Sequence, residues 1–168
     1  MNCMKGLLFV LLLVTSTIGF AQQPVRPEPP YKKNPVLPPL EILQPDSSIL
    51  TKADLKKQET LIMYFSPDCD HCIKQTEDMI KRMKDLKKLQ IIMITHQPME
   101  MLVDFIKKYK LRDYSNIKTG QDAKFLLPGF YQMKSFPYFA LYDKEGKLIT
   151  TFESNTKVDT LLKAFQKQ

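Results

Sequence analysis

Two cysteines separated by two residues are the part of the sequence whose residue types and spacing carry the clearest chemistry. Cys69 and Cys72 enclose Asp70 and His71. At the start of a helix, the first sulfur lies over unpaired backbone N–H groups and the positive end of the helix dipole, which favours its thiolate. The thiolate attacks disulfides, and a second cysteine one turn later can resolve the mixed disulfide. The spacing therefore predicts Cys69 as the nucleophile and Cys72 as the resolving thiol.

The residues beside the cysteines are predicted to tune the redox potential. A charged His71 stabilises the Cys69 thiolate and so the reduced form, which makes the pair more oxidising. Asp68 and Asp70 act in the opposite sense, because nearby carboxylates disfavour a second negative charge. The sequence does not determine whether these charges together raise or lower the reduction potential. A solvent-exposed His71 without a redox role is the alternative interpretation.

Apolar runs that alternate with amphipathic segments predict the elements that hold these residues. Residues 60–65 (TLIMYF) and 90–95 (QIIMIT) have the length and continuous apolar character of buried strands. A long amphipathic helix is expected to start at the cysteine motif, and another over residues 99–109, after Pro98. The order strand, helix, strand, helix predicts a parallel βαβ unit.

The second half of the chain predicts a hairpin and a closing helix. Residues 137–142 (PYFALY) and 148–152 flank a four-residue turn that ends in Gly146, which is expected to take the left-handed conformation. A short helix over 122–130, broken by a Pro-Gly pair, is expected before the hairpin, and a helix over 156–167 after it. The whole order predicts an α/β fold with a mixed central sheet and helices on both faces.

These features resemble the thioredoxin-like superfamily and, within it, the exported thiol-disulfide oxidoreductases of the TlpA/ResA type. The resemblance covers about residues 48–168 and rests on the strand 60–65, the CDHC motif with its helix, and residues 135–138 (SFPY). It implies a three-layer sandwich with a cis-proline at Pro137 beside the active-site disulfide. It also implies that the backbone of Phe136 pairs with a substrate chain. An ordinary trans proline at a strand start is the alternative for Pro137.

The sequence departs from that family at two places near the motif. Family members commonly have a buried acid in the strand before the motif, where it helps to move the proton of the second cysteine; Met63 occupies this position here. Proton transfer must then use water or another group. The family's tryptophan before the motif is also missing, since the chain contains no Trp, and Ser66-Pro67-Asp68 fills that space.

The first residues have the layout of an export signal. Residues 1–21 combine Lys5, an apolar run over 7–14 and a small residue, Ala21, before a cleavage point. A membrane anchor that is retained is the alternative, although residues 15–17 (TST) interrupt the apolar length that a span needs. Export, most simply to the periplasm, leaves two cysteines in the mature chain, in an oxidising compartment.

Prolines separate this signal from the domain. Eight of the 12 prolines lie in residues 22–47. Proline fixes the backbone extended and removes an N–H donor, so neither a regular helix nor an interior strand is expected there. We interpret residues 22–47 as a semi-rigid spacer ahead of a domain at 48–168, with the apolar residues 40–43 able to dock on that domain.

Composition limits the classes of function. A chain of 168 residues holds one ordinary domain, and 43% hydrophobic and 26% charged residues suffice for a packed core. The net charge of +7 does not favour nucleic-acid binding, because the lysines are distributed around acidic residues without interleaved aromatic residues. A mildly basic surface is also compatible with a position near an anionic membrane.

Three other functions use the same cysteines. A copper or zinc carrier would add a remote histidine such as His96, although copper-delivery proteins of related fold space their cysteines one residue wider. A thiol peroxidase is suggested by Ser66, three residues before Cys69, but Ile62 replaces the proline of peroxiredoxins. A structural disulfide is the third. The exchange chemistry that we favour needs no dissolved cofactor; it needs protein thiol or disulfide substrates and a redox partner that recycles the pair.

Overall fold

The computed structural model describes residues 28–166, which contain a single mixed sheet of seven strands. The strand order is β2-β1-β5-β4-β3-β6-β7. Strands β3, β4 and β5 are parallel, whereas β6 is antiparallel to β3, β7 to β6, and β1 to both β2 and β5. The strands are β1 (Glu41–Leu43), β2 (Ile49–Thr51), β3 (Thr60–Tyr64), β4 (Gln90–Thr95), β5 (Ile117–Gln121), β6 (Tyr138–Tyr142) and β7 (Leu148–Glu153).

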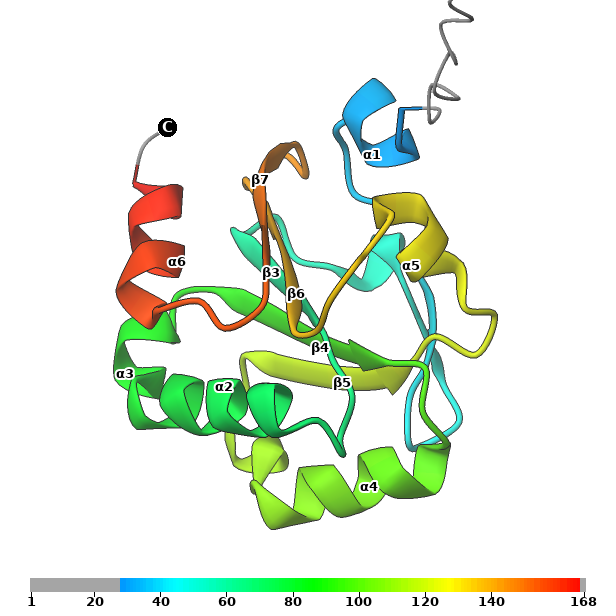
Figure 1. Cartoon of the computed structure of the whole chain (residues 1–168), viewed down its shortest axis with the longest axis vertical. Coiled ribbons are helices and arrows are strands. Elements are labelled where there is room, and N and C mark those ends of the chain that lie inside the picture. The colour runs from blue at the N-terminus through cyan, green and yellow to red at the C-terminus, as the bar shows by residue number, and fades with distance from the viewer. Residues whose placement is uncertain (1–27, 167–168) are drawn as a thin grey trace, which may run out of the picture.

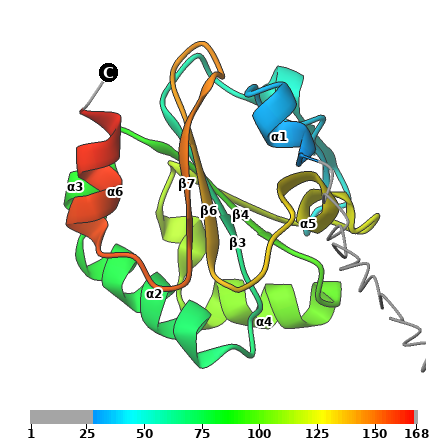
Figure 2. The same cartoon turned by 45° about the horizontal axis from the view of Figure 1, so that its top comes forward.

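Helices cover both faces of this sheet (Figures 1 and 2). They are α1 (Pro30–Lys33), α2 (Asp70–Lys81), α3 (Met83–Leu86), α4 (Met99–Lys108), α5 (Leu126–Tyr131) and α6 (Val158–Phe165). Helices α2, α3, α4 and α6 pack on one face, and α1 and α5 pack on the other. The arrangement confirms the predicted three-layer α/β sandwich.

Strand β3 lies inside the sheet, between β4 and β6, and leads to the cysteines. All five of its residues are buried, with Leu61 and Met63 facing α2 and Ile62 and Tyr64 facing α5. Burial on both faces is the reason why this segment is a continuous apolar run in the sequence. The chain therefore leaves a fully buried strand of the sheet shortly before the cysteine motif.

Strand β5 and helix α5 differ from the sequence predictions. Strand β5 (IKTGQ) is polar and mostly half-buried, so no apolar run reveals it, yet it pairs with β4 along five residues. The sequence predicts a helix that breaks at Pro128, whereas α5 includes this residue. Pro128 is in the first turn of α5, where a backbone N–H has no partner within the helix and its loss costs little.

The expectation that prolines exclude helix and interior strand from residues 22–47 is wrong at two places. The chain forms α1, and β1 lies between β2 and β5 inside the sheet. The prolines fall before and after β1 and leave its backbone N–H groups free to pair. Leu40 and Ile42 are buried in the core, which confirms that the apolar residues 40–43 dock on the domain.

The β6–β7 hairpin agrees with the sequence prediction. Gly146 has a φ of 79°, the left-handed conformation expected at the end of the turn. The predicted signal, residues 1–21, lies outside the described residues. Between residues 28 and 166, the structure contains no helix with the length and apolar character of a membrane span.

Candidate active site

The cysteine motif begins helix α2, as the spacing predicts. After β3 the chain makes a turn in which the backbone N–H of Cys69 donates to the Ser66 carbonyl at 3.2 Å. Cys69 is the residue that caps α2, and its carbonyl accepts the N–H of Ile73 at 2.9 Å. The first backbone N–H groups of α2 have no acceptor within the helix, and they point toward the N-terminal end, where Cys69 lies.

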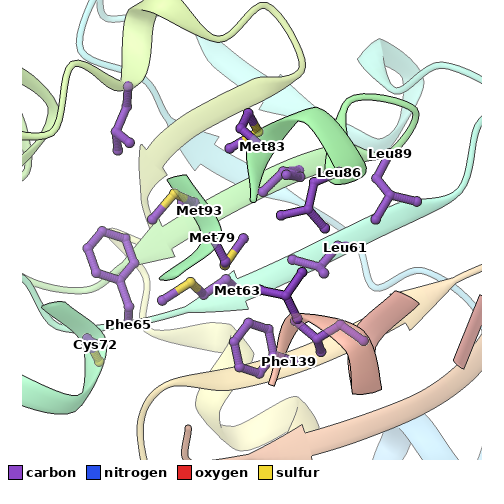
Figure 3. Packing of buried hydrophobic residues seen from close by; sticks show 14 of the residues in the cluster. Leu61, Met63, Phe65, Cys72, Met79, Met83, Leu86, Leu89, Met93 and Phe139 are labelled. Atoms are coloured by element: carbon purple, nitrogen blue, oxygen red, sulfur yellow. The ribbon is translucent and has the colours of Figure 1, made fainter. Parts of the chain in front are cut away.

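The two sulfurs differ in their exposure. Cys69 is half-buried, whereas Cys72 is 0% exposed and lies near Phe65 at an edge of the apolar cluster between the sheet and α2 (Figure 3). Burial raises the pKa of the Cys72 thiol to about 12; the hydrogen bond from the backbone of Ser66 opposes this shift and the contact with Cys69 adds to it. A partner can therefore reach Cys69, while Cys72 remains a hidden, protonated thiol at neutral pH.

Phe136 and Pro137 lie beside the turn that carries the cysteines. The register of β3 and β6 pairs Tyr64 with Tyr138, which sets the residues before Tyr138 opposite the residues after Tyr64. The Phe136–Pro137 peptide bond is cis, as the family resemblance implied. The Phe136 ring packs against Tyr64, with ring centroids 5.5 Å apart. The fold thus brings the predicted substrate-contacting segment next to the motif.

His71 and Asp70 are exposed in the first turn of α2. The side chain of Asn155 holds His71 at two points: its amide N–H donates to the His71 carbonyl at 2.8 Å, and its oxygen lies 2.9 Å from His71 Nδ1. Because an amide oxygen only accepts, Nδ1 carries a proton in this contact. Asn155 comes from the loop before α6, 84 residues away in the sequence, and no sequence signal pointed to it.

A buried glutamine ties α2 to the same loop. Gln75 Nε2 donates to the Thr156 carbonyl at 3.0 Å, and the Thr156 N–H donates back to Gln75 Oε1 at 2.8 Å. Sequence reasoning missed this pair, although a glutamine on the apolar face of an amphipathic helix was a signal that a partner was needed. The pair and Asn155 together fix the first turns of α2 against the loop before α6.

Ser66 takes part in a network of side-chain hydrogen bonds beside the cysteine motif. Its hydroxyl donates to Asp68 Oδ1 at 2.5 Å and accepts from Gln97 Nε2 at 3.0 Å. Gln97 is held in turn by Gln121, whose side-chain N–H donates to the Gln97 carbonyl at 3.0 Å. In the sequence, Ser66 stands out only by its spacing from Cys69, and nothing there predicts the contacts with Gln97 and Gln121.

His96 lies among aromatic rings. Its ring is 5.0 Å from Phe125, 5.9 Å from Phe136 and 6.0 Å from Tyr64, measured between centroids. Its buried Nδ1 has no hydrogen-bond partner among residues 28–166. In the same range, no group of three or more His, Cys, Asp or Glu residues is arranged to hold a metal ion. The structure therefore does not assemble the metal site considered above from Cys69, Cys72 and His96.

Comparison with known families decides the assignment of the fold. The family model for a thioredoxin-like domain matches residues 47–168. The chain belongs to this thioredoxin-like family. The match begins one residue before the domain start at 48 that the sequence indicated, and it includes the cysteine motif and Pro137. No curated protein matches the sequence.

Solved structures with the thioredoxin-like fold resemble this protein at low sequence identity. The exposed lipoprotein thioredoxin Etrx1 of Streptococcus pneumoniae is 22% identical, with a TM-score of 0.62 over 78% of this chain and 100% of that chain. A secreted disulfide oxidoreductase of Mycobacterium tuberculosis, homologous to Escherichia coli DsbE, is 16% identical, with a TM-score of 0.60 over 76% and 94%. StoA of Bacillus subtilis is 15% identical, with a TM-score of 0.57 over 77% and 96%.

Proposed function

We propose that this protein is an exported thiol-disulfide oxidoreductase that exchanges disulfides with protein substrates through Cys69 and Cys72. One observation carries the proposal: a half-buried cysteine caps α2, and a fully buried thiol follows one turn later. Disulfide exchange needs this asymmetry, because one sulfur must meet the substrate and the other must wait for the mixed disulfide.

In the reducing direction, the Cys69 thiolate attacks one sulfur of a substrate disulfide. A bond forms between Cys69 Sγ and that sulfur, and the other substrate sulfur leaves with the electron pair and takes up a proton. Cys72 then loses its proton and attacks Cys69 Sγ, which releases the second substrate sulfur and leaves a Cys69–Cys72 disulfide. The substrate gains two electrons, so a separate redox partner must reduce the pair again. The oxidising direction is the same sequence reversed.

An aromatic surface next to the motif supports a polypeptide substrate. Phe125, Phe136 and His96 form this surface, and Phe125 is 56% exposed. Phe125 also has a φ of 52°, a conformation uncommon for a bulky residue, and strained positions of this kind cluster at functional sites. In the proposed complex, Phe136 and Pro137 present backbone to the substrate chain, and His71 and Asp70 tune the potential.

Export to the periplasm is part of the proposal. It is supported by the signal-like residues 1–21 and by two of the similar solved proteins, of which one is an exposed lipoprotein and the other a secreted oxidoreductase. Sequencing the N-terminus of the protein from envelope fractions tests this point. A chain that begins at Gln22 is expected. A chain that begins at Met1 would favour the alternative of an uncleaved anchor near the membrane.

The exchange activity is tested with insulin as the substrate and three variants. Cys69→Ala is expected to abolish insulin reduction, and Cys72→Ala is expected to accumulate a mixed disulfide visible by mass spectrometry. The double variant Cys69→Ala/Cys72→Ala is the control for background thiol chemistry. Full activity of Cys69→Ala would overturn the proposal. Stoichiometric copper binding without exchange would favour the metal carrier, and faster turnover of peroxide than of disulfides would favour the peroxidase.

A further inference from the structure

The proposed exchange requires the buried Cys72 to lose its proton, and β3 offers no acid for this step. The side chains of β3 on the side of Cys72 are Leu61 and Met63, followed by Phe65, and all three are buried in the same apolar cluster (Figure 3). An apolar pocket disfavours a thiolate. The proton must therefore pass to an acceptor outside these three side chains.

Ser66 is the residue that connects Cys72 to a carboxylate. Its backbone N–H donates to Cys72 Sγ at 3.5 Å, and its hydroxyl donates to Asp68 Oδ1 at 2.5 Å. Ser66 is 6% exposed, whereas Asp68 is exposed to solvent. The backbone N–H of Ser66 only donates, so the hydroxyl of the same residue is the group that can pass a proton from the pocket of Cys72 to a carboxylate in contact with water.

Gln97 fixes the direction of the Ser66 hydroxyl. Its side-chain N–H donates to Ser66 Oγ at 3.0 Å, and its own backbone N–H is held by Thr95 Oγ1 at 3.1 Å. A hydroxyl has one proton and two lone pairs. Because one lone pair accepts from Gln97 and the proton points to Asp68, one lone pair remains to accept a proton from elsewhere.

We propose that Asp68 accepts the proton of Cys72 through the Ser66 hydroxyl when Cys72 attacks the mixed disulfide. This inference rests on the proposed exchange activity. The Cys72 proton passes to Ser66 Oγ as the Ser66 proton passes to Asp68. The Cys72 sulfur bonds to Cys69 Sγ, the bond between Cys69 and the substrate sulfur breaks, and the substrate leaves as a thiolate that takes a proton from water. Asp68 returns its proton to solvent.

Charged groups of α2 and α4 lie near the proposed proton path from Cys72 to Asp68. Asp70 and His71 lie in the first turn of α2, and Asp104 and Lys108 of α4 line a shallow surface pocket with Pro67. Asp70 is the useful comparison, because it carries the same charge as Asp68 at the same turn. The hydrogen bond to Ser66 distinguishes the two carboxylates, since the structure records it for Asp68.

Charge and proton transfer predict opposite effects for the loss of Asp68. The negative charge of Asp68 helps to raise the pKa of Cys72, so its removal by charge alone would favour the Cys72 thiolate and speed the second step. If Asp68 accepts the proton, its removal slows the second step instead. General acid–base groups typically contribute about 100-fold or more to a rate.

The test follows both steps in one experiment with the aromatic disulfide DTNB. Attack by Cys69 releases one coloured thiolate, and attack by Cys72 on the resulting mixed disulfide releases the second. Stopped-flow absorbance on the mature protein separates the two phases. For Asp68→Asn and Ser66→Ala, we expect the first phase to persist and the second to slow at least tenfold at pH 7. Asp70→Asn, the charge-matched control, removes the same charge without breaking the contact with Ser66, so it is expected to shift the reduction potential without slowing the second phase.

A pH profile distinguishes proton transfer by Asp68 from a purely structural role, because a structural role would not change the shape of the profile. The second phase of the wild-type protein is expected to fall as a carboxylate becomes protonated at acidic pH. In Asp68→Asn this inflection is expected to be absent, so that the rate rises with pH only through ionisation of the Cys72 thiol, and it is expected to return in Asp68→Glu. A second phase that is unchanged or faster in Asp68→Asn, as in Asp70→Asn, would overturn the inference. Absence of the first phase in the wild-type protein would instead overturn the proposed function.

Discussion

Cys69 and Cys72 have the same side chain and lie one helical turn apart, so the different roles that we propose for them must come from their surroundings. Cys69 caps α2 and stands where the backbone N–H groups of the first turn favour an anion. Cys72 is enclosed by apolar side chains, and burial raises the pKa of its thiol to about 12. In the proposed exchange, the helix start favours Cys69 as the nucleophile, and burial in the core favours Cys72 as the resolving thiol.

The protonation of Cys72 makes the stability of the reduced protein depend on alkaline pH. Its pKa rises from an ordinary 9.0 to about 12 on folding, so the folded state holds a proton that the unfolded state loses above pH 9. The stabilisation is complete below pH 9 and is lost as the pH rises toward 12, at about 1.4 kcal/mol per pH unit. Urea unfolding with a reductant, at pH 8 and pH 10, measures this loss.

The variant Cys72→Ala is the control for this pH dependence. It retains the buried tyrosines and every other group that titrates at high pH, and its cavity costs the same at both pH values. We expect the wild-type protein to lose about 1.4 kcal/mol more than Cys72→Ala between pH 8 and pH 10. Equal losses in the two proteins would contradict the shifted pKa of Cys72.

The position of His71 predicts a change in the reduction potential. Asn155 holds the ring next to the start of α2, and a ring that carries a positive charge at this place stabilises the Cys69 thiolate. We expect His71→Ala to lower the potential by about 30 mV, which corresponds to about 1.4 kcal/mol, and Asn155→Ala to lower it less. Equilibration with glutathione and thiol alkylation measure both values. A higher potential in His71→Ala would contradict a charged ring.

At this scale, the sequence predicts what is local and misses what is distant. Cys69 and Cys72 follow from spacing alone, and Pro137 follows from its place at a strand start together with the family resemblance. Asn155 reaches His71 across 84 residues, and Gln97 reaches Ser66 across 31. Contacts of this kind depend on the tertiary fold, so no periodicity or spacing in one sequence reveals them.

At the scale of elements, the strands also divide into those that the local sequence reveals and those that depend on the tertiary fold. Strands β3 and β4 are buried on both faces, and their continuous apolar runs predict them within one residue. Strand β5 alternates weakly and contains Gly120, so its position depends on the strands beside it. Gly120 is required because Leu43 of β1 pairs with the adjacent Gln121 and brings the two backbones close together.

A side chain at position 120 is expected to separate β1 from β5. A Cβ atom there would lie 2.4 Å from Ile42 Cγ2 and 2.9 Å from the Leu43 carbonyl oxygen, and the latter contact is with backbone that cannot rotate away. We expect Gly120→Ala to lower the free energy of unfolding by about 1–3 kcal/mol, as overpacking does. The urea unfolding midpoint measures this effect.

Gly129 offers the matched control within the same protein. It lies in α5, and a Cβ atom added there meets no other atom within 4 Å. Because alanine is favoured over glycine in a helix by about 0.5–1 kcal/mol, Gly129→Ala is expected to leave stability unchanged or slightly raised. Similar losses of stability in both variants would show that Gly120 is not needed for the close approach of β1 to β5.

At the scale of the whole molecule, the residues before 48 belong to the folded unit. Strand β1 bridges β5 and β2, so β2 is attached to the sheet through it. The N–H of Leu37 donates to the Gly146 carbonyl at 2.9 Å, and the N–H of Leu148 in β7 donates to the Pro35 carbonyl at 2.7 Å. Residues 35–43 thus contact strands at both ends of the sheet, and we propose that the domain begins before the predicted boundary at 48.

Removal of the residues before Ser48 is therefore expected to destabilise the domain, although the family match begins at residue 47. Such a chain lacks β1 and the buried side chains of Leu37, Leu40 and Ile42. A buried leucine truncated to alanine costs about 2–5 kcal/mol, so the loss of the whole segment should exceed about 4 kcal/mol. Urea unfolding of chains that begin at Glu28 and at Ser48 measures the difference, with Leu40→Ala in the longer chain as an intermediate case. Equal stability of the two chains would mean that residues 28–47 are a spacer after all, and that β1 contributes no net stability to the sheet.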